Sequence, residues 1–105
     1  MVDPQTFRQL ALSFPATEEL PHFEKASFRV KKKIFATLTP DGLVACVKLL
    51  EADQSVFCAF DKSIIYPVDN KWGKQGWTLI QLKKVRKDML KDILSTAYQH
   101  VHAKK

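Results

Sequence analysis

Three short segments of this chain gather the residue types that could do chemistry. "VKKKIF" (residues 30–35) and "LKKVRK" (residues 82–87) are strongly basic, and "NKWGKQGWT" (residues 70–78) combines lysines, two glycines and both tryptophans. Lysine and arginine neutralise phosphates, and an indole ring can stack on a base, so the chemistry indicated is nucleic-acid binding. The candidate contact residues are Arg29, Lys31, Lys32, Lys33, Lys71, Trp72, Lys74, Lys83, Lys84, Arg86 and Lys87.

Each segment also has a plainer interpretation. A run of charge at a hairpin tip is usually a solvated turn, which applies to residues 31–33. The basic residues 83–87 precede a predicted helix, where cations oppose the helix dipole at a cost of about 0.3–1 kcal/mol each. A bound anion would relieve that cost, but a chance crowding of lysines is an equally good explanation.

The two tryptophans are expected to play different roles. Trp77 opens an alternating segment, which favours a core or half-core position in a strand, whereas Trp72 lies between glycine and lysine in a predicted loop and is expected to be more exposed. "GKQG" has the GXXG spacing of the KH-domain loop, but it leads into a strand instead of joining two helices. The plainer interpretation gives Gly73 and Gly76 positive φ in a tight loop.

Catalytic and metal-binding patterns are weak. His100 and His102 lie two residues apart on a predicted helix, so they point in different directions and cannot share a metal. Cys46 and Cys58 have no C-x-x-C spacing and are expected to stay reduced, without a disulfide. We therefore expect a protein that is not an enzyme and that needs no metal or other cofactor.

Composition and charge set further limits. The chain has 105 residues, 46% of them hydrophobic, and a net charge of +6, which predicts one domain over residues 1–105 with a single core. Residues 1–24 carry one basic and four acidic side chains, a net charge of −3, so the rest of the chain carries +9. This asymmetry attracts polyanions, although solubility alone would also explain it. With no signal-peptide pattern and no apolar run long enough to span a bilayer, we expect a cytoplasmic protein without a membrane partner, favoured as a monomer.

Periodicity predicts an α+β fold. Helices are expected at residues 3–15, with Asp3 as the cap and Pro4 at the first position, at 51–60, with Asp53 as a possible cap, and at 86–101. Strands are expected at 27–30, 33–38, 43–48, 64–68 and 77–82, with a turn at Thr39–Gly42 and a polar connection at 16–26. The second strand should place Ile34, Ala36 and Leu38 on one face and Phe35 on the other. In the helix at 51–60, Val56, Phe57 and Phe60 share one side.

Three segments together resemble a known family. "PHFEKASFRVKKKIFATL", "YPVDNKWGKQGWTLIQL" and "VRKDMLKDILSTAYQHV" are similar to the MmcQ/YjbR family of small bacterial proteins, and the likeness runs over nearly the whole chain. The resemblance implies a fold like that of the bacterial frataxin CyaY, an antiparallel sheet with the N- and C-terminal helices packed on one face. It also implies a double-wing DNA-binding motif. Family members often have glycine in the first hairpin turn, where this chain has only lysines.

The leading hypothesis is therefore DNA binding with little sequence specificity. The two wings would be the lysines at 31–33 and the tryptophan segment with Lys71 and Lys74, while the basic residues at 83–87 add phosphate contacts. The alternative is a protein-interaction or small-ligand-binding module whose basic surface is incidental, with Trp72 covering a pocket or a partner surface.

Overall fold

A six-stranded antiparallel sheet forms the centre of the protein, in the strand order β1-β2-β3-β4-β6-β5. The computed structural model describes residues 2–22 and 24–103. Its elements are α1 (Pro4–Leu12), β1 (Thr17–His22), β2 (Lys25–Val30), β3 (Lys33–Leu38), β4 (Val44–Lys48), α2 (Glu51–Phe60), β5 (Ile65–Pro67), α3 (Lys71–Lys74), β6 (Trp77–Gln81) and α4 (Lys87–Ala103). The predicted α+β class is confirmed.

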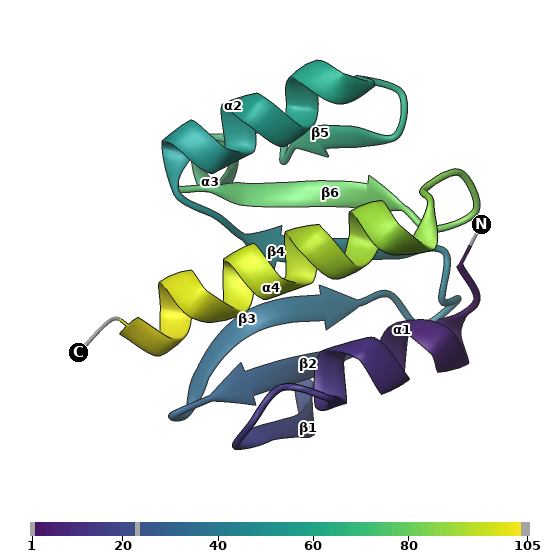
Figure 1. Cartoon of the computed structure of the whole chain (residues 1–105), viewed down its shortest axis with the longest axis vertical. Helices are drawn as coiled ribbons and strands as arrows, with labels where there is room; N and C mark the ends of the chain where they lie inside the picture. Colours follow the sequence, from purple (N-terminus) through teal and green to yellow (C-terminus); the bar gives the residue numbers. More distant parts are fainter. Residues whose placement is uncertain (1, 23, 104–105) are drawn as a thin grey trace.

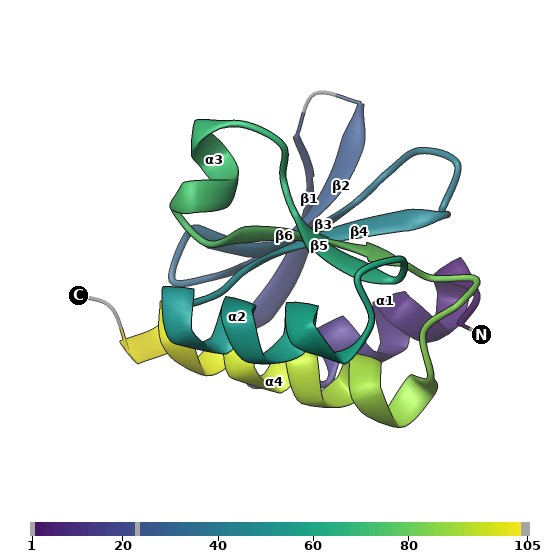
Figure 2. The ribbon, with the colours of Figure 1, turned by 90° about the horizontal axis from the view of Figure 1, so that it is seen from above.

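Three helices cover one face of this sheet. Figures 1 and 2 show α1, α2 and α4 side by side in one layer, with α4 crossing the middle of the sheet and α3 alone on the opposite side. The predicted stripe of α4 forms the helix side of the core, with Leu90, Ile93, Leu94, Ala97, Tyr98 and Val101 all buried. We call the opposite face of the sheet the open face.

Aromatic contacts and the predicted cap fix α1 in this layer. Thr6 donates its backbone N–H to the Asp3 carboxylate at 2.7 Å, and Pro4 opens the helix, as predicted. Phe7 meets Phe28 of β2 edge to face, at 5.4 Å between ring centroids. The Tyr98 hydroxyl donates to the Pro15 carbonyl at 2.7 Å, which ties α4 to the chain leaving α1.

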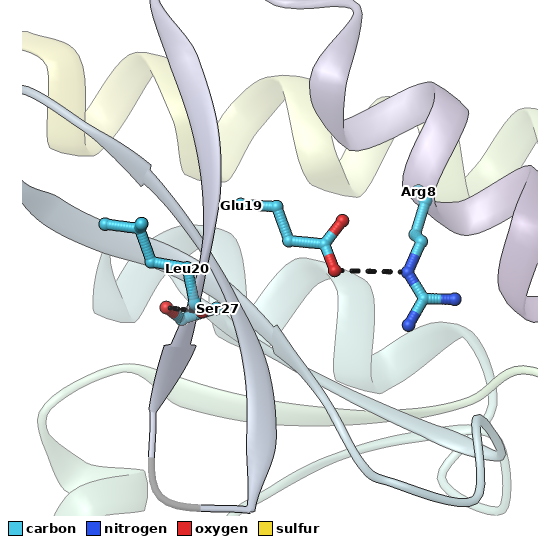
Figure 3. A network of polar contacts seen from close by, with 4 residues as sticks. All are labelled: Arg8, Glu19, Leu20 and Ser27. Atoms are coloured by element: carbon cyan, nitrogen blue, oxygen red, sulfur yellow. Dashed lines mark hydrogen bonds and ion pairs between the residues drawn. The ribbon is translucent and has the colours of Figure 1, made fainter.

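The prediction of a polar connection at residues 16–26 is wrong, because β1 occupies most of this segment. β1 pairs with β2 along its whole length at the edge of the sheet, where a strand tolerates Pro21 and a solvated outer side. Figure 3 shows how it is held: Arg8 of α1 lies 3.2 Å from the Glu19 carboxylate, and the Ser27 hydroxyl donates to the Leu20 carbonyl at 2.7 Å. Hydrogen bonds, and not an apolar pattern, define this strand.

The predicted facing of residues in β3 holds for Ala36 and Leu38, which both lie in the core, but is wrong for Ile34 and Phe35. The register with β2 shifts between Phe28, opposite Ala36, and Arg29, opposite Ile34, so Phe35 is an extra residue in β3. Phe35 consequently turns towards the helices and meets Tyr98 edge to face at 5.6 Å. Ile34 lies on the open face instead of sharing a side with Ala36.

Helix α2 begins at Glu51, before Asp53, the residue expected to cap it. Leu50 is the N-cap, without a side-chain hydrogen bond, and Asp53 lies in the first turn. The residue that α2 buries is Gln54, whereas Val56 and Phe60 are 69% and 62% exposed. Phe57, the third residue of the predicted apolar side, is half-buried against the core, so that side is turned to solvent only in part.

Candidate nucleic-acid interface

Two lysines with left-handed backbone form the turn between β2 and β3. Lys31 and Lys32 have φ of 53° and 68°, so the two-residue turn has the positive φ at both positions that normally selects asparagine or glycine. Holding a lysine in this conformation costs about 1 kcal/mol or more per residue. The Lys31 ammonium donates to the carbonyl of His102, 3.2 Å away at the end of α4. We call residues 31–33 the lysine turn.

The segment expected to be a loop around Trp72 is the short helix α3. Asn70 begins it, because its side-chain oxygen accepts the backbone N–H of Trp72 at 2.8 Å. Trp72 is 48% exposed, and the Lys71 ammonium lies 5.7 Å from the centre of its ring. Gly73 is helical instead of having positive φ; a Cβ there would lie 2.0 Å from the Val68 carbonyl oxygen, so close approach is what requires glycine. Gly76 has the expected positive φ, 105°.

Strand register places the lysine turn and α3 at the same end of the sheet. β3 begins at Lys33, β4 ends at Lys48, and Lys48 lies opposite Trp77 at the start of β6. The Lys48 ammonium also donates to the Gln75 carbonyl at 2.6 Å, which joins β4 to the end of α3. The two predicted wings thus share an end of the molecule, although α3 lies on the open side and Lys31 contacts the helix layer.

The third basic group lies at the other end. Residues 83–87 connect the end of β6 to the start of α4, at the end of the sheet opposite the lysine turn (Figure 1). Arg86 forms an exposed ion pair with Asp88 at 3.3 Å, and Asp88 stands in the first turn of α4. This carboxylate partly offsets the unfavourable charge at the helix start. Lys83, Lys84, Arg86 and Lys87 are therefore not brought together with the wings.

Arg29 is the last residue but one of β2, so it lies next to the lysine turn and not in α3 or among residues 83–87. It occupies an open-face position of β2, and its Nε donates to the Ser27 hydroxyl at 3.0 Å. Glu18 of β1 lies directly opposite Arg29 in the register. A phosphate approaching Arg29 would therefore also meet a carboxylate.

Sequence reasoning missed a concavity of about 360 Å³ on the open face. It is lined by Lys25, Ile34, Thr37, Cys46, Val68, Trp72 and Trp77. The available signal was alternation, because Cys46 in β4 and Trp77 in β6 each fall on the open side of their strand. What could not be foreseen was the adjacency of β4 and β6, which are separated in the sequence by α2, β5 and α3.

The concavity is half enclosed and weakly polar. Trp77 is half-buried, less exposed than Trp72 as predicted, and the Lys48 ammonium lies 5.4 Å from the centre of its ring. Burial raises the pKa of the Cys46 thiol to about 11, so this side chain is a neutral thiol at neutral pH. Both cysteines are free, with Cys58 half-buried on α2.

Within residues 2–22 and 24–103, no three His, Cys, Asp or Glu side chains gather where they could hold a metal ion. None of the helices in that part of the chain has both the length and the apolar character needed to cross a bilayer.

A family model named YjbR matches residues 12–100, which is most of the chain. The chain belongs to the YjbR family. The match spans the structure from the last residue of α1 to near the end of α4, and so includes the lysine turn, α3 and the open face.

A solved structure supports the same fold for this YjbR-family chain. The crystal structure of a Deinococcus radiodurans protein, described as a DUF419 family-model domain, superimposes with a TM-score of 0.86 at 21% sequence identity. The alignment covers 99% of this chain and 81% of the other. At that identity the likeness establishes the fold alone. No curated protein matches the sequence.

Proposed function

We propose that this YjbR-family protein binds duplex DNA without catalysing a reaction and with little sequence preference. The contacts are made by phosphate neutralisation through the lysine turn and through Lys71 and Lys74 of α3. The observation that carries the proposal is the pair of left-handed lysines, Lys31 and Lys32. Asparagine or glycine would form this turn at lower cost, so folding alone does not favour lysine there.

The position of the turn supports the same function. It projects from the end of the sheet that also carries α3, so two basic protrusions flank one end of a compact domain with principal-axis extents of 30 × 30 × 26 Å. Phosphate contacts of this kind orient a protein on DNA without reading bases. The basic residues at 83–87 lie at the other end of the sheet, and Arg29 has Glu18 directly opposite it, so we assign them at most secondary contacts.

A salt titration tests this function. If about four phosphates are contacted, a plot of log K against log salt concentration for a labelled duplex should have a slope of about −3.6. Affinity that changes little with salt would contradict phosphate neutralisation.

The second candidate is a protein-interaction module. It is favoured by the outer side of α2, where Val56 and Phe60 expose most of their apolar surface. Burial of that surface by a partner would respond weakly to salt, in contrast to DNA binding. Phe60→Ala should then abolish partner binding and leave DNA binding unchanged.

A further inference from the structure

The open face of the sheet is partly exposed, although Ser27 and Thr37 on this face are buried. Figure 2 shows α1, α2 and α4 beneath the sheet and α3 on the other side, at one end. The register assigns Ile34, Cys46 and Trp77 to this open side on three neighbouring strands. All three are half-buried instead of fully enclosed, so the face is apolar without being covered.

Two indole rings border the concavity on this face. Trp77 comes from β6 and Trp72 from α3, and both line the same space of about 360 Å³ together with the aliphatic Ile34 and Val68. This volume is at the small end of the range for ligand sites, roughly 300–1,000 Å³. Flat aromatic walls and a small apolar floor suit a planar ring that can stack.

Positive charge surrounds this apolar space. The ammonium groups of Lys48 and Lys71 lie 5.4 Å and 5.7 Å from the centres of the Trp77 and Trp72 rings, and Lys25 lines the concavity directly. Among the described residues that line the concavity, none carries a carboxylate. A ring stacked on either indole would therefore have an ammonium group close enough to meet an attached phosphate.

We propose that the open face binds a single strand of nucleic acid, with an unpaired base stacked in the concavity against Trp72 or Trp77 and its phosphates beside Lys25, Lys48 and Lys71. Antiparallel sheets with helices on one face and aromatic side chains on the other stack unpaired bases in this way. Base stacking on aromatic side chains tolerates any sequence. Paired bases inside a duplex cannot reach these rings, so this site is separate in its chemistry from the proposed duplex-binding wings.

The test measures binding of a fluorescently labelled oligothymidylate of about 12 nucleotides, a length within the range of single-strand sites. Trp72→Leu should weaken binding by about 5- to 150-fold, the effect of losing one stacked base, and Trp72→Phe should retain most of the affinity. Phe60→Leu is the matched control, because Phe60 is an exposed aromatic residue on the helix side. In Trp72→Phe, the fluorescence of Trp77 should be quenched when the oligomer binds.

Three results would overturn the proposal. The first is that wild type and Trp72→Leu bind the oligothymidylate with equal affinity, and the second is that Phe60→Leu loses as much affinity as Trp72→Leu. The third is that thymidine monophosphate displaces the labelled oligomer fully, at the same concentration of nucleotide at which an unlabelled oligomer does so. The last result would assign the concavity to a free nucleotide.

Failure of this site is distinguishable from failure of the wings. The pair Lys31→Asn and Lys32→Gly should weaken duplex binding and leave oligothymidylate binding within about twofold, whereas Trp72→Leu should do the reverse. An oligothymidylate that fails to bind wild type at low salt, while a duplex binds, overturns only the single-strand site.

Discussion

The Gln54 side-chain amide lies 2.9 Å from the carbonyl oxygen of Gly73, and this hydrogen bond connects α2 to α3 through the interior. The same nitrogen also lies 3.2 Å from the Trp77 carbonyl and 3.1 Å from the Thr78 hydroxyl. One buried side chain therefore fixes the short helix that carries Trp72 to the strand that carries Trp77.

Removing this amide should destabilise the protein. Gln54→Ala removes a buried donor from the Gly73 and Trp77 carbonyls, which each keep one backbone N–H partner, and we expect a loss of about 1–3 kcal/mol in the free energy of unfolding. Denaturant unfolding followed by circular dichroism measures it. Gln99→Ala, which removes an exposed amide from α4, should change stability by less than about 0.5 kcal/mol. Equal stability of the two variants would show that Gln54 does not hold α3.

Gly73 and Gly76 should resist substitution because an added side chain would clash at both positions, and Gly76 also has positive φ. A Cβ at Gly73 would lie 2.0 Å from the Val68 carbonyl oxygen, and one at Gly76 would lie 1.9 Å from the Leu49 carbonyl oxygen in a backbone of positive φ. Gly73→Ala and Gly76→Ala should each lower the free energy of unfolding by more than about 1 kcal/mol. Lys74→Ala, an exposed change in the same segment, is the control and should be nearly neutral.

Cys46 should make stability depend on alkaline pH. Burial raises the pKa of its thiol to about 11 from the ordinary 9.0, so the folded state keeps a proton that the unfolded state loses. The contribution is constant below pH 9, and stability then falls between pH 9 and 11 by up to about 1.4 kcal/mol per pH unit.

The comparison uses Cys58→Ala as the background, so that one thiol remains. Its free energy of unfolding should decline more steeply from pH 9 to 11 than that of the double variant with Cys46→Ala. Parallel curves for the two proteins would mean that the Cys46 thiol titrates normally in the folded state.

The helices α1, α2 and α4 and most strands were predictable because their apolar residues repeat at regular intervals, whereas the short helix α3 was expected to be a loop. The apolar stripe of α4 can be predicted from the sequence of that helix alone, and the turn at Thr39–Gly42 from its proline and glycine alone. The structure has this turn, in which the Gly42 backbone N–H donates to the Thr39 carbonyl at 2.9 Å. β1 was missed because it is an edge strand with polar residues and Pro21, so pairing with β2 is what defines it. The extra residue Phe35 leaves no signal in the local pattern.

The candidate site was predictable only in part. The sequence indicates which residues are basic, but register decides that the lysine turn and α3 share an end while residues 83–87 do not. The left-handed backbone of Lys31 and Lys32 was also hidden, because lysine is not a residue that predicts such a turn. The open-face concavity depends on strands that are neighbours in space and distant in sequence.

Substituting Lys31 and Lys32 should raise the stability of the protein while it weakens DNA binding. Lys31→Asn with Lys32→Gly removes two positive charges and supplies residues suited to positive φ, so the free energy of unfolding should rise by about 1 kcal/mol. The lost contact between Lys31 and the His102 carbonyl is exposed and offsets this only slightly. Thermal and denaturant unfolding measure the change, and a clear loss of stability would show that the lysines are needed for folding.

The most direct test of duplex binding is the affinity of this same double variant for a labelled duplex over a series of salt concentrations. The account predicts weaker binding than wild type and a slope of log K against log salt that is shallower by about 1.8, because two phosphate contacts are lost. The control, Lys62→Gln with Lys91→Gln, removes two exposed lysines elsewhere and should bind nearly as wild type does. Equal affinity and slope in the two double variants would contradict the assignment of DNA binding to the lysine turn.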